Sequence, residues 1–306
     1  MYRCYCTHKG DKNVKQKKML PYLFMLPALL SLLLIYLIPF VYSIVISMTD
    51  WTGIGFKINF WGLKNYISII LDKNFTTVLK NTLIYFVELV GIQFLVSLLL
   101  AALVNGKFKG SKFFETVFFL PTVVCTVAVG FIWNVMFDTM NGPIKILFDW
   151  IGGSRFADLY WLSDPRTAIH CVSFVNIWQW AGWSMVIYIA GMQSIDPCLY
   201  EAAKIDGAGP IQNFFHITLP LLAPAITITL VNSTIGSLKM FDLPFVMTNG
   251  GPGYATETMG MLMYNYTFSL NKVGYGAAIA ILMFIIIMVI SGVQTILLRK
   301  NEDRVM

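Results

Sequence analysis

The side chains that commonly carry out chemistry are few in this sequence and stand far apart. The three histidines, His8, His170 and His216, share no short motif with a carboxylate or a nucleophile, and neither H-E-x-x-H nor G-x-S-x-G occurs. Cys4 and Cys6 form the only cluster with His8, but a structural zinc site needs four ligands at suitable spacing. We therefore predict no catalytic residue, no metal site and no cofactor, and we do not expect an enzyme.

A nucleotide-binding loop is also absent from the sequence. The P-loop pattern G-x-x-x-x-G-K-[ST] does not occur, and the basic, glycine-rich stretch at 105–112 has the wrong spacing and follows no predicted strand. If ATP drives this protein, another chain must bind it.

One polar segment, residues 196–216, carries the signals of a short, fixed helix. Asp196 can cap the first turn, Pro197 suits the first helical position, and Gly207 can adopt the left-handed conformation that ends a helix. A simple connection between antiparallel helices needs only about two to eight residues. Glu201 can pair with a basic group on a partner protein. Two interpretations stay open: a docking helix, or a connector that packs only on its own bundle.

A second group of polar and aromatic side chains lies within otherwise apolar segments. Aromatic rings can cover a pyranose face while amides and hydroxyls bind its OH groups, so these residues are candidates for a sugar path. Ser and Asn also bond neighbouring helices, and Trp is common at membrane interfaces, so structural packing is the alternative. The candidates are Asn176, Gln179, Trp180, Trp183, Asn232 and Ser233.

Glu88 is the one carboxylate well inside an apolar segment. It can make a structural hydrogen bond within the bundle, or it can belong to a substrate path. A single carboxylate makes no proton relay, so coupling to an ion gradient is not predicted.

The elements that must position these residues are membrane helices. Hydrophobic residues make up 57% of the 306 positions, charged residues only 12%, and the mean hydropathy is +0.68. Six segments carry at most one charge and are long enough to cross a hydrocarbon core of about 30 Å, so we predict an all-α polytopic protein with six transmembrane helices. The first segment is too long for a signal peptide and is predicted to stay uncleaved. The six segments are 19–48, 81–104, 116–137, 167–195, 217–238 and 273–298.

Basic residues are unevenly divided between the two sets of connecting segments. With the N terminus inside, residues 1–18, 105–115, 196–216 and 299–306 hold 13 of the 22 Lys and Arg. The opposite loops are longer and hold the other nine, so the positive-inside rule places both termini in the cytoplasm. We predict a basic tail at 1–18, a six-helix domain at 19–298 that contains loop 196–216, and a second tail at 299–306.

The polar segment and the residues after it contain a longer pattern. Its members are the run Glu201-Ala202-Ala203, then Asp206, Gly207 and Ala208, then Phe214, then Ile217-Thr218-Leu219-Pro220. In order and spacing this pattern resembles the EAA motif of inner-membrane permeases in binding-protein-dependent ABC importers, in its carbohydrate-importer form. The similarity extends over nearly the whole chain after the basic tail, and the chain looks most like short six-span relatives of the maltose-importer F protein. Further matches lie at 21–27, 119–121, 248–253 and 274–277.

This resemblance implies a type I importer bundle in a bacterial-type inner membrane. The implied partners are a second related permease, two ATP-binding subunits and an extracytoplasmic solute-binding protein, with the loop as a coupling helix on the ATPase. The solute would be a sugar or a related compound such as glycerol phosphate. The other function class is a stand-alone channel or lipid-modifying enzyme. The implied coupling residues are Glu201, Ala202, Ala203, Asp206, Gly207, Phe214, Ile217, Leu219 and Pro220.

Overall fold

The computed structural model describes residues 20–55, 57–106, 109–151 and 160–302, and these are helical apart from connecting loops. No strand occurs in these ranges; one isolated bridge joins Thr49 and Phe60. The all-α prediction is therefore confirmed for the described chain. The internal contacts divide the protein into two compact units, residues 1–45 and 46–306, which we describe separately. The predicted tail at 1–18, with Cys4, Cys6 and His8, lies outside the described residues.

The first unit holds most of one apolar helix that is interrupted by a wider turn. The helix begins as α1 (Leu20–Leu32), passes through a π-helical turn (Leu33–Leu37) and continues as α2 (Ile38–Ser47), whose last residues belong to the second unit. Pro39 is the second residue after the turn. Because proline has no N–H to donate and its ring crowds the preceding turn, a local widening accommodates it.

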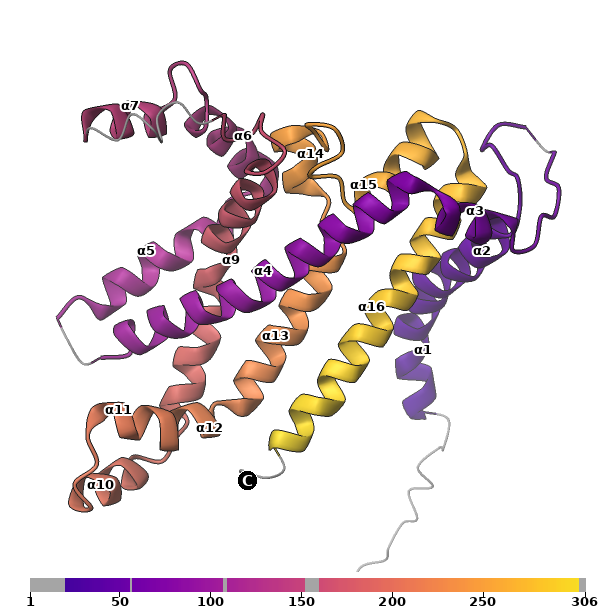
Figure 1. Cartoon of the computed structure of the whole chain (residues 1–306). Coiled ribbons are helices and arrows are strands. Elements are labelled where there is room, and N and C mark those ends of the chain that lie inside the picture. The colour runs from indigo at the N-terminus through magenta and orange to yellow at the C-terminus, as the bar shows by residue number, and fades with distance from the viewer. Residues whose placement is uncertain (1–19, 56, 107–108, 152–159, 303–306) are drawn as a thin grey trace, which may run out of the picture. The chain divides into compact units, whose positions relative to one another are not determined.

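The second unit is built around two long helices that pack along each other. Helices α4 (Lys73–Val104) and α9 (Ala168–Gln193) make the most extensive contact of any described pair, and α13 (Ala223–Leu238) lies against both. Helix α16 (Val273–Glu302) packs beside α13 (Figure 1). These four helices carry most of the polar residues that the sequence analysis singled out within apolar segments.

Two predicted spans are bent. Helices α5 (Ser111–Val123) and α6 (Thr126–Met136) meet at 100°, and α13 turns by 67° from the preceding segment, Pro210–Leu221. By length and composition, three described helices can cross a membrane, or up to five if each bent pair is one span. Helix α9 is not among them, because its Asn, Gln and His side chains lower its hydropathy. Each of the six predicted segments contains a helix, but these criteria give fewer than six spans.

Short helices occupy the regions that the sequence analysis treats as outer loops. They are α3 (Lys64–Leu71), α7 (Pro143–Trp150), α14 (Asp242–Thr248) and α15 (Met259–Tyr264). Helices of six to eight residues are too short to be stable alone, so packing against the bundle stabilises them. A pattern search for long apolar runs therefore misses them.

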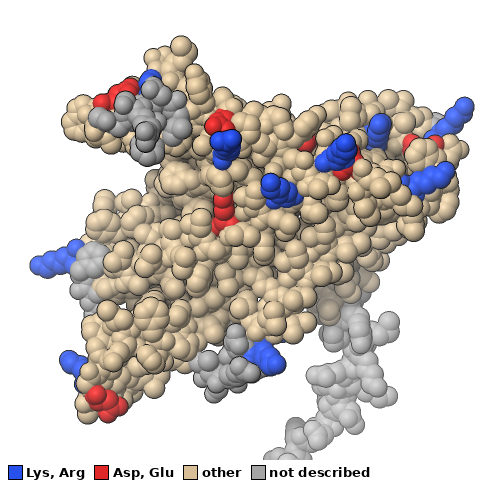
Figure 2. Space-filling model, in the orientation of Figure 1, with Lys and Arg blue, Asp and Glu red and all other residues tan. Residues whose placement is uncertain are grey.

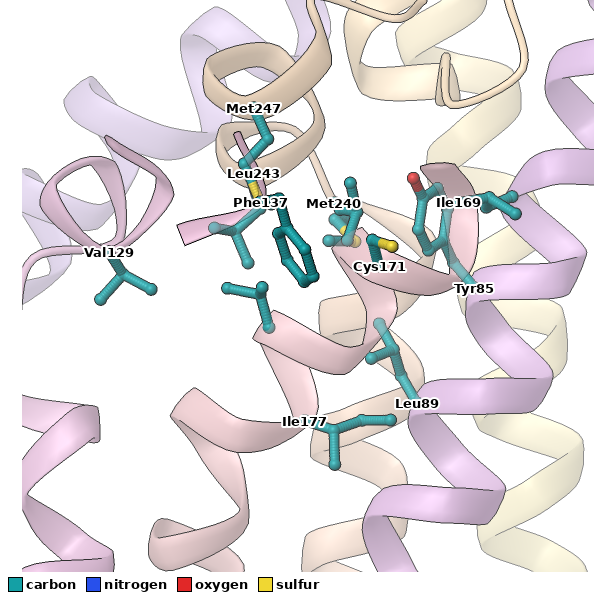
Figure 3. Close-up of a cluster of buried hydrophobic side chains, with 12 residues drawn as sticks. Tyr85, Leu89, Val129, Phe137, Ile169, Cys171, Ile177, Met240, Leu243 and Met247 are labelled. Atoms are coloured by element: carbon teal, nitrogen blue, oxygen red, sulfur yellow. The ribbon is translucent and has the colours of Figure 1, made fainter. Parts of the chain in front are cut away.

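Three buried apolar clusters stabilise the described part of the second unit, and two of them join α4 to α9. One joins α4, α6, α9 and α14 and includes Tyr85, Leu89, Val129, Ile177 and Leu243 (Figure 3). The other joins the C-terminal ends of α4 and α9 to the segment before α13 and includes Leu98, Ala101, Met192 and Leu222. The bundle is thus fastened near both ends.

Charged side chains lie mainly at the two ends of the second unit. In Figure 2 they gather along its upper and lower margins and leave a tan band that contains few of them between. Helices α3, α7 and α14 lie at one end, whereas α10 (Pro197–Ile205), α11 (Pro210–Asn213) and the last turns of α16 lie at the other (Figure 1). An apolar band between two polar margins is the surface expected of a protein in a bilayer.

Candidate functional site

The predicted short helix exists as α10, and both of its ends are capped as expected. The carboxylate of Asp196 accepts a hydrogen bond from the backbone N–H of Cys198 at 2.9 Å, and this bond lowers the pKa of Asp196. Gly207 has a φ of +80°, and the N–H of Ala208 donates to the carbonyl of Ala203 at 2.9 Å. This bonding closes the C-terminal end of the helix. Helix α10 therefore begins and ends at fixed residues.

Helix α10 bonds to the segment that follows it through a hydroxyl pair, and that segment packs on the bundle. The hydroxyls of Tyr200 and Thr218 lie 2.9 Å apart, and Thr218 is buried. Phe214 and Leu219 pack against the cluster at the ends of α4 and α9. Tyr200 thus bonds α10 to the segment before α13, and that segment packs on the ends of α4 and α9.

The exposed side chains of α10 and of the segment after it include charged and apolar residues. Glu201 is exposed, and its carboxylate has no partner among the residues that the structure describes. Nearby Ile205 and Ile211 are 87% and 74% exposed, and Phe215 is 58% exposed. Ala202 and Asp206 are exposed, whereas Ala203, Phe214, Ile217, Leu219 and Pro220 are half-buried. Large apolar side chains are therefore exposed beside charged ones at this polar end of the molecule.

A cavity of about 460 Å³ lies among α4, α6, α9, α13 and α14. Indole rings, amides and hydroxyls line it together, and this mixture suits a polyhydroxylated solute. The polar and aromatic lining comprises Gln93, Thr126, Asn176, Trp180, Trp183, Asn232, Ser233, Ser237, Lys239, Phe241 and Asp242. Gly236 also lines the cavity and leaves space on the α13 wall.

Five of the six residues predicted for a solute path line this cavity: Asn176, Trp180, Trp183, Asn232 and Ser233. The sixth, Gln179, does not. Its side chain is fully buried, and its amide nitrogen donates to the backbone carbonyl of Val124 at 3.0 Å. The prediction grouped Gln179 with its neighbours because a polar residue in an apolar helix gives the same signal whether it faces a cavity or another helix.

Several lining residues were missed by the sequence analysis. Gln93 is a polar residue within an apolar segment and is detectable by the criterion used for the others. Thr126 and Gly236 carry no such signal, because threonine and glycine are common in membrane helices. Lys239 and Asp242 follow the predicted segment 217–238, and their positions gave no sign of a cavity.

Glu88 does not line the cavity but bonds to a neighbouring helix. Its carboxylate lies 2.5 Å from Nδ1 of His170, which joins α4 to α9. The structural interpretation of Glu88 is therefore favoured over a place on the path. Among the described residues, no group of three or more His, Cys, Asp or Glu side chains is arranged for a metal ion.

Long apolar helices around a polar and aromatic cavity, with an exposed capped helix at one end, define an integral membrane permease. The family described as "Binding-protein-dependent transport system inner membrane component" matches residues 75–303, which is most of the chain. The chain belongs to this family of ABC-importer permeases and is an inner-membrane protein. The family membership predicted from the EAA pattern is confirmed.

Individual relatives cover nearly the whole chain. It is 37% identical over 292 residues to the "Probable ABC transporter permease protein YurN" of Bacillus subtilis (strain 168), covering 95% of this chain and 99% of that one. It is 39% identical over 285 residues to the "Probable starch degradation products transport system permease protein AmyD" of Thermoanaerobacterium thermosulfurigenes, with coverages of 92% and 94%.

A solved structure has the same fold. The match is to a chain in a bacterial alginate ABC transporter in complex with an alginate pentasaccharide-bound periplasmic protein. The TM-score is 0.82, the sequence identity is 24%, and the alignment covers 94% of this chain and 96% of that one.

Proposed function

We propose that this chain is one permease subunit of an ATP-driven sugar importer and forms half of its transmembrane pathway. The observation that carries the proposal is the cavity among α4, α6, α9, α13 and α14, which Trp180 and Trp183 line together with the polar residues Asn232 and Ser233. Sugars bind through this combination of ring stacking and hydrogen bonds. The relative AmyD, named for the transport of starch degradation products, supports a carbohydrate as the solute.

The cavity proposal is tested by removing one polar contact. Asn232→Ala is expected to lower uptake of the saccharide that the wild-type complex imports by about two- to tenfold, because one hydrogen bond contributes about 0.5–1.5 kcal/mol net. Uptake is measured in proteoliposomes that contain the assembled complex. Asn105→Ala, at the exposed end of α4, is the matched control and is expected to import normally. Wild-type uptake by Asn232→Ala would remove this residue from the path.

The partners follow from the exposed helix and from the family. A second related permease completes the pathway, and an extracytoplasmic binding protein delivers the solute. Two separate ATP-binding subunits hydrolyse the ATP that drives transport. Helix α10 docks on an ATP-binding subunit, with Glu201 facing a basic group and Ile205 and Ile211 covered by the interface. A capped helix attached to the bundle through Tyr200 and Phe214 transmits a movement of that subunit as a rigid body.

The proposed topology has six spans with both termini in the cytoplasm. Loop 196–216 and the end of α16 lie at the same end of the second unit, which supports a shared side for them (Figure 1). The basic residues favour the cytoplasm as that side. The domain limits proposed from the sequence, 1–18, 19–298 and 299–306, follow this arrangement.

Native Cys198 provides a test of this topology. It is exposed on α10, so in a variant that lacks the other four cysteines it reports the side on which the loop lies. We expect a membrane-impermeant maleimide to label it in inside-out vesicles and to leave it unlabelled in intact cells. Labelling in intact cells would place the loop outside and exclude docking to a cytoplasmic ATPase.

A further inference from the structure

The bend between α5 and α6 leaves backbone outside any helix in the middle of a predicted span. Val124 and Cys125 have extended conformations, with ψ values of 137° and 129°. Pro121 lies in the last turn of α5, so one amide donor is also missing there. Backbone carbonyls at membrane depth must be bonded within the protein, because no water is present in the hydrocarbon region. The bend therefore needs partners from elsewhere in the fold.

Gln179 of α9 provides these partners on both sides of the bend. Its Nε2 donates to the carbonyl of Val124 at 3.0 Å and to the hydroxyl oxygen of Thr126 at 3.3 Å. Its backbone carbonyl accepts a hydrogen bond from the hydroxyl of Thr122 at 2.8 Å. One residue thus bonds the last turn of α5, the bend and the first residue of α6. The carbonyl of Val124 can only accept, which fixes the amide with its nitrogen toward the bend.

A glycine one turn further along α9 allows this close approach. A Cβ atom at Gly182 would lie 2.0 Å from the backbone oxygen of Phe118 and 2.9 Å from the Cα of Phe119. Positions three apart on a helix share a face, so Gly182 and Gln179 both face α5. The backbones of α5 and α9 therefore meet closely enough for a glutamine to reach the bend.

The bend also sets one wall of the cavity. Thr126 begins α6 and lines the cavity, whereas Asn176, Trp180 and Trp183 line it from α9. Gln179 lies between these walls but is fully buried and does not face the cavity. We propose that Gln179 is a positioning residue whose amide fixes the α5–α6 bend and thereby holds the Thr126 wall against α9, without touching the solute. Its importance for transport rests on the proposed solute path.

Cys125 provides a direct readout, because it lies at the bend and its thiol is free and exposed. A spin label is attached to Cys125 in a variant without the other four cysteines, in the assembled complex in lipid nanodiscs. Gln179→Leu is expected to raise the ratio of mobile to restricted label about fivefold, because losing one hydrogen bond shifts such an equilibrium by about this factor. Gln193→Leu, the same substitution at an exposed position of α9, is the control and is expected to leave the spectrum unchanged.

Thr126 variants show whether the hydrogen bond, rather than the volume of Gln179, matters. Thr126→Val is expected to increase mobility by less than Gln179→Leu, whereas Thr126→Ser keeps the acceptor and should give the wild-type spectrum. The double variant Gln179→Leu/Thr126→Val should add nothing to Gln179→Leu alone. Unchanged spectra in both Gln179→Leu and Thr126→Val would overturn the proposal, as would additive effects in the double variant. The spin-label measurement needs no solute, so a negative result would overturn the role of Gln179 but not the proposed solute path. Normal import by cavity variants would overturn the solute path but not the role of Gln179 in the bend.

Discussion

Glu201→Ala is expected to release the ATP-binding subunit from the permease while the permease stays in the membrane. Glu201 has no partner among the described residues and lies one turn before exposed Ile205 on α10, so in the proposed assembly its carboxylate would be desolvated against a basic group. Removing one partner of such a pair costs about 2–5 kcal/mol, which is at least about thirtyfold in affinity. Retention of the ATP-binding subunit is measured by pull-down, together with ATPase rate and solute uptake. Glu201→Gln, which keeps the shape and removes the charge, should behave like Glu201→Ala.

Gly207→Val tests the same loop through the backbone. The φ of +80° at Gly207 is unfavourable for valine by about 1–2 kcal/mol, whereas its Cβ would meet no atom within 4 Å. We therefore expect Gly207→Val to uncouple ATP hydrolysis from uptake. The cause would be a changed backbone direction after position 207 and not a steric clash. Gly209 has equally open surroundings and a φ of −77°, so Gly209→Ala is the matched control. Normal association, hydrolysis and uptake in both Glu201→Ala and Gly207→Val would show that the loop is only a connector.

Gly236→Phe is expected to block the pathway without disturbing the complex. Gly236 lines the cavity from α13, and a Cβ atom there would meet nothing within 4 Å, so the phenyl ring extends into the 460 Å³ space. Replacing a glycine inside a helix also removes an unfavourable backbone entropy, so the fold should not suffer. Uptake should fall more than about tenfold, since a barrier increase of about 1.4 kcal/mol is enough for that factor.

The control for Gly236→Phe is Gly292→Phe. Gly292 lies in α16, has equally open surroundings and does not line the cavity, so this variant should import normally. Both variants should retain the ATP-binding subunit in a pull-down. Rapid uptake by Gly236→Phe would mean that the solute does not pass through this cavity.

The coupling loop was predictable because its signals are local. Asp196, Pro197 and Gly207 act within the few residues around them, and each occupies the position in α10 that its chemistry favours. Glu201 is exposed, as pairing with a partner protein would require, since a short capped helix between two spans has little of its own bundle to cover it. The role of this helix in coupling stays a prediction.

The bend in the third predicted span was not predictable in the same way. Pro121 indicates that the helix can be interrupted there. The bend itself is held by Gln179, more than fifty residues further along the chain, and by the close approach of α5 and α9 at Gly182. Sequence reasoning gave Gln179 the same role as Asn176 and Trp180, because it shows which residues are polar but not which way they face. Only the packing of α5 on α9 separates a residue that bonds backbone from residues that line the cavity.

The most direct test of the central claim is saccharide uptake by proteoliposomes of defined composition. The permease is reconstituted with its partner permease, its ATP-binding subunits and its solute-binding protein, and uptake is followed with and without ATP. We expect uptake only when all parts and ATP are present, and we expect Gly236→Phe to abolish it. Uptake by this chain alone without ATP, or undiminished uptake through Gly236→Phe, would contradict the account.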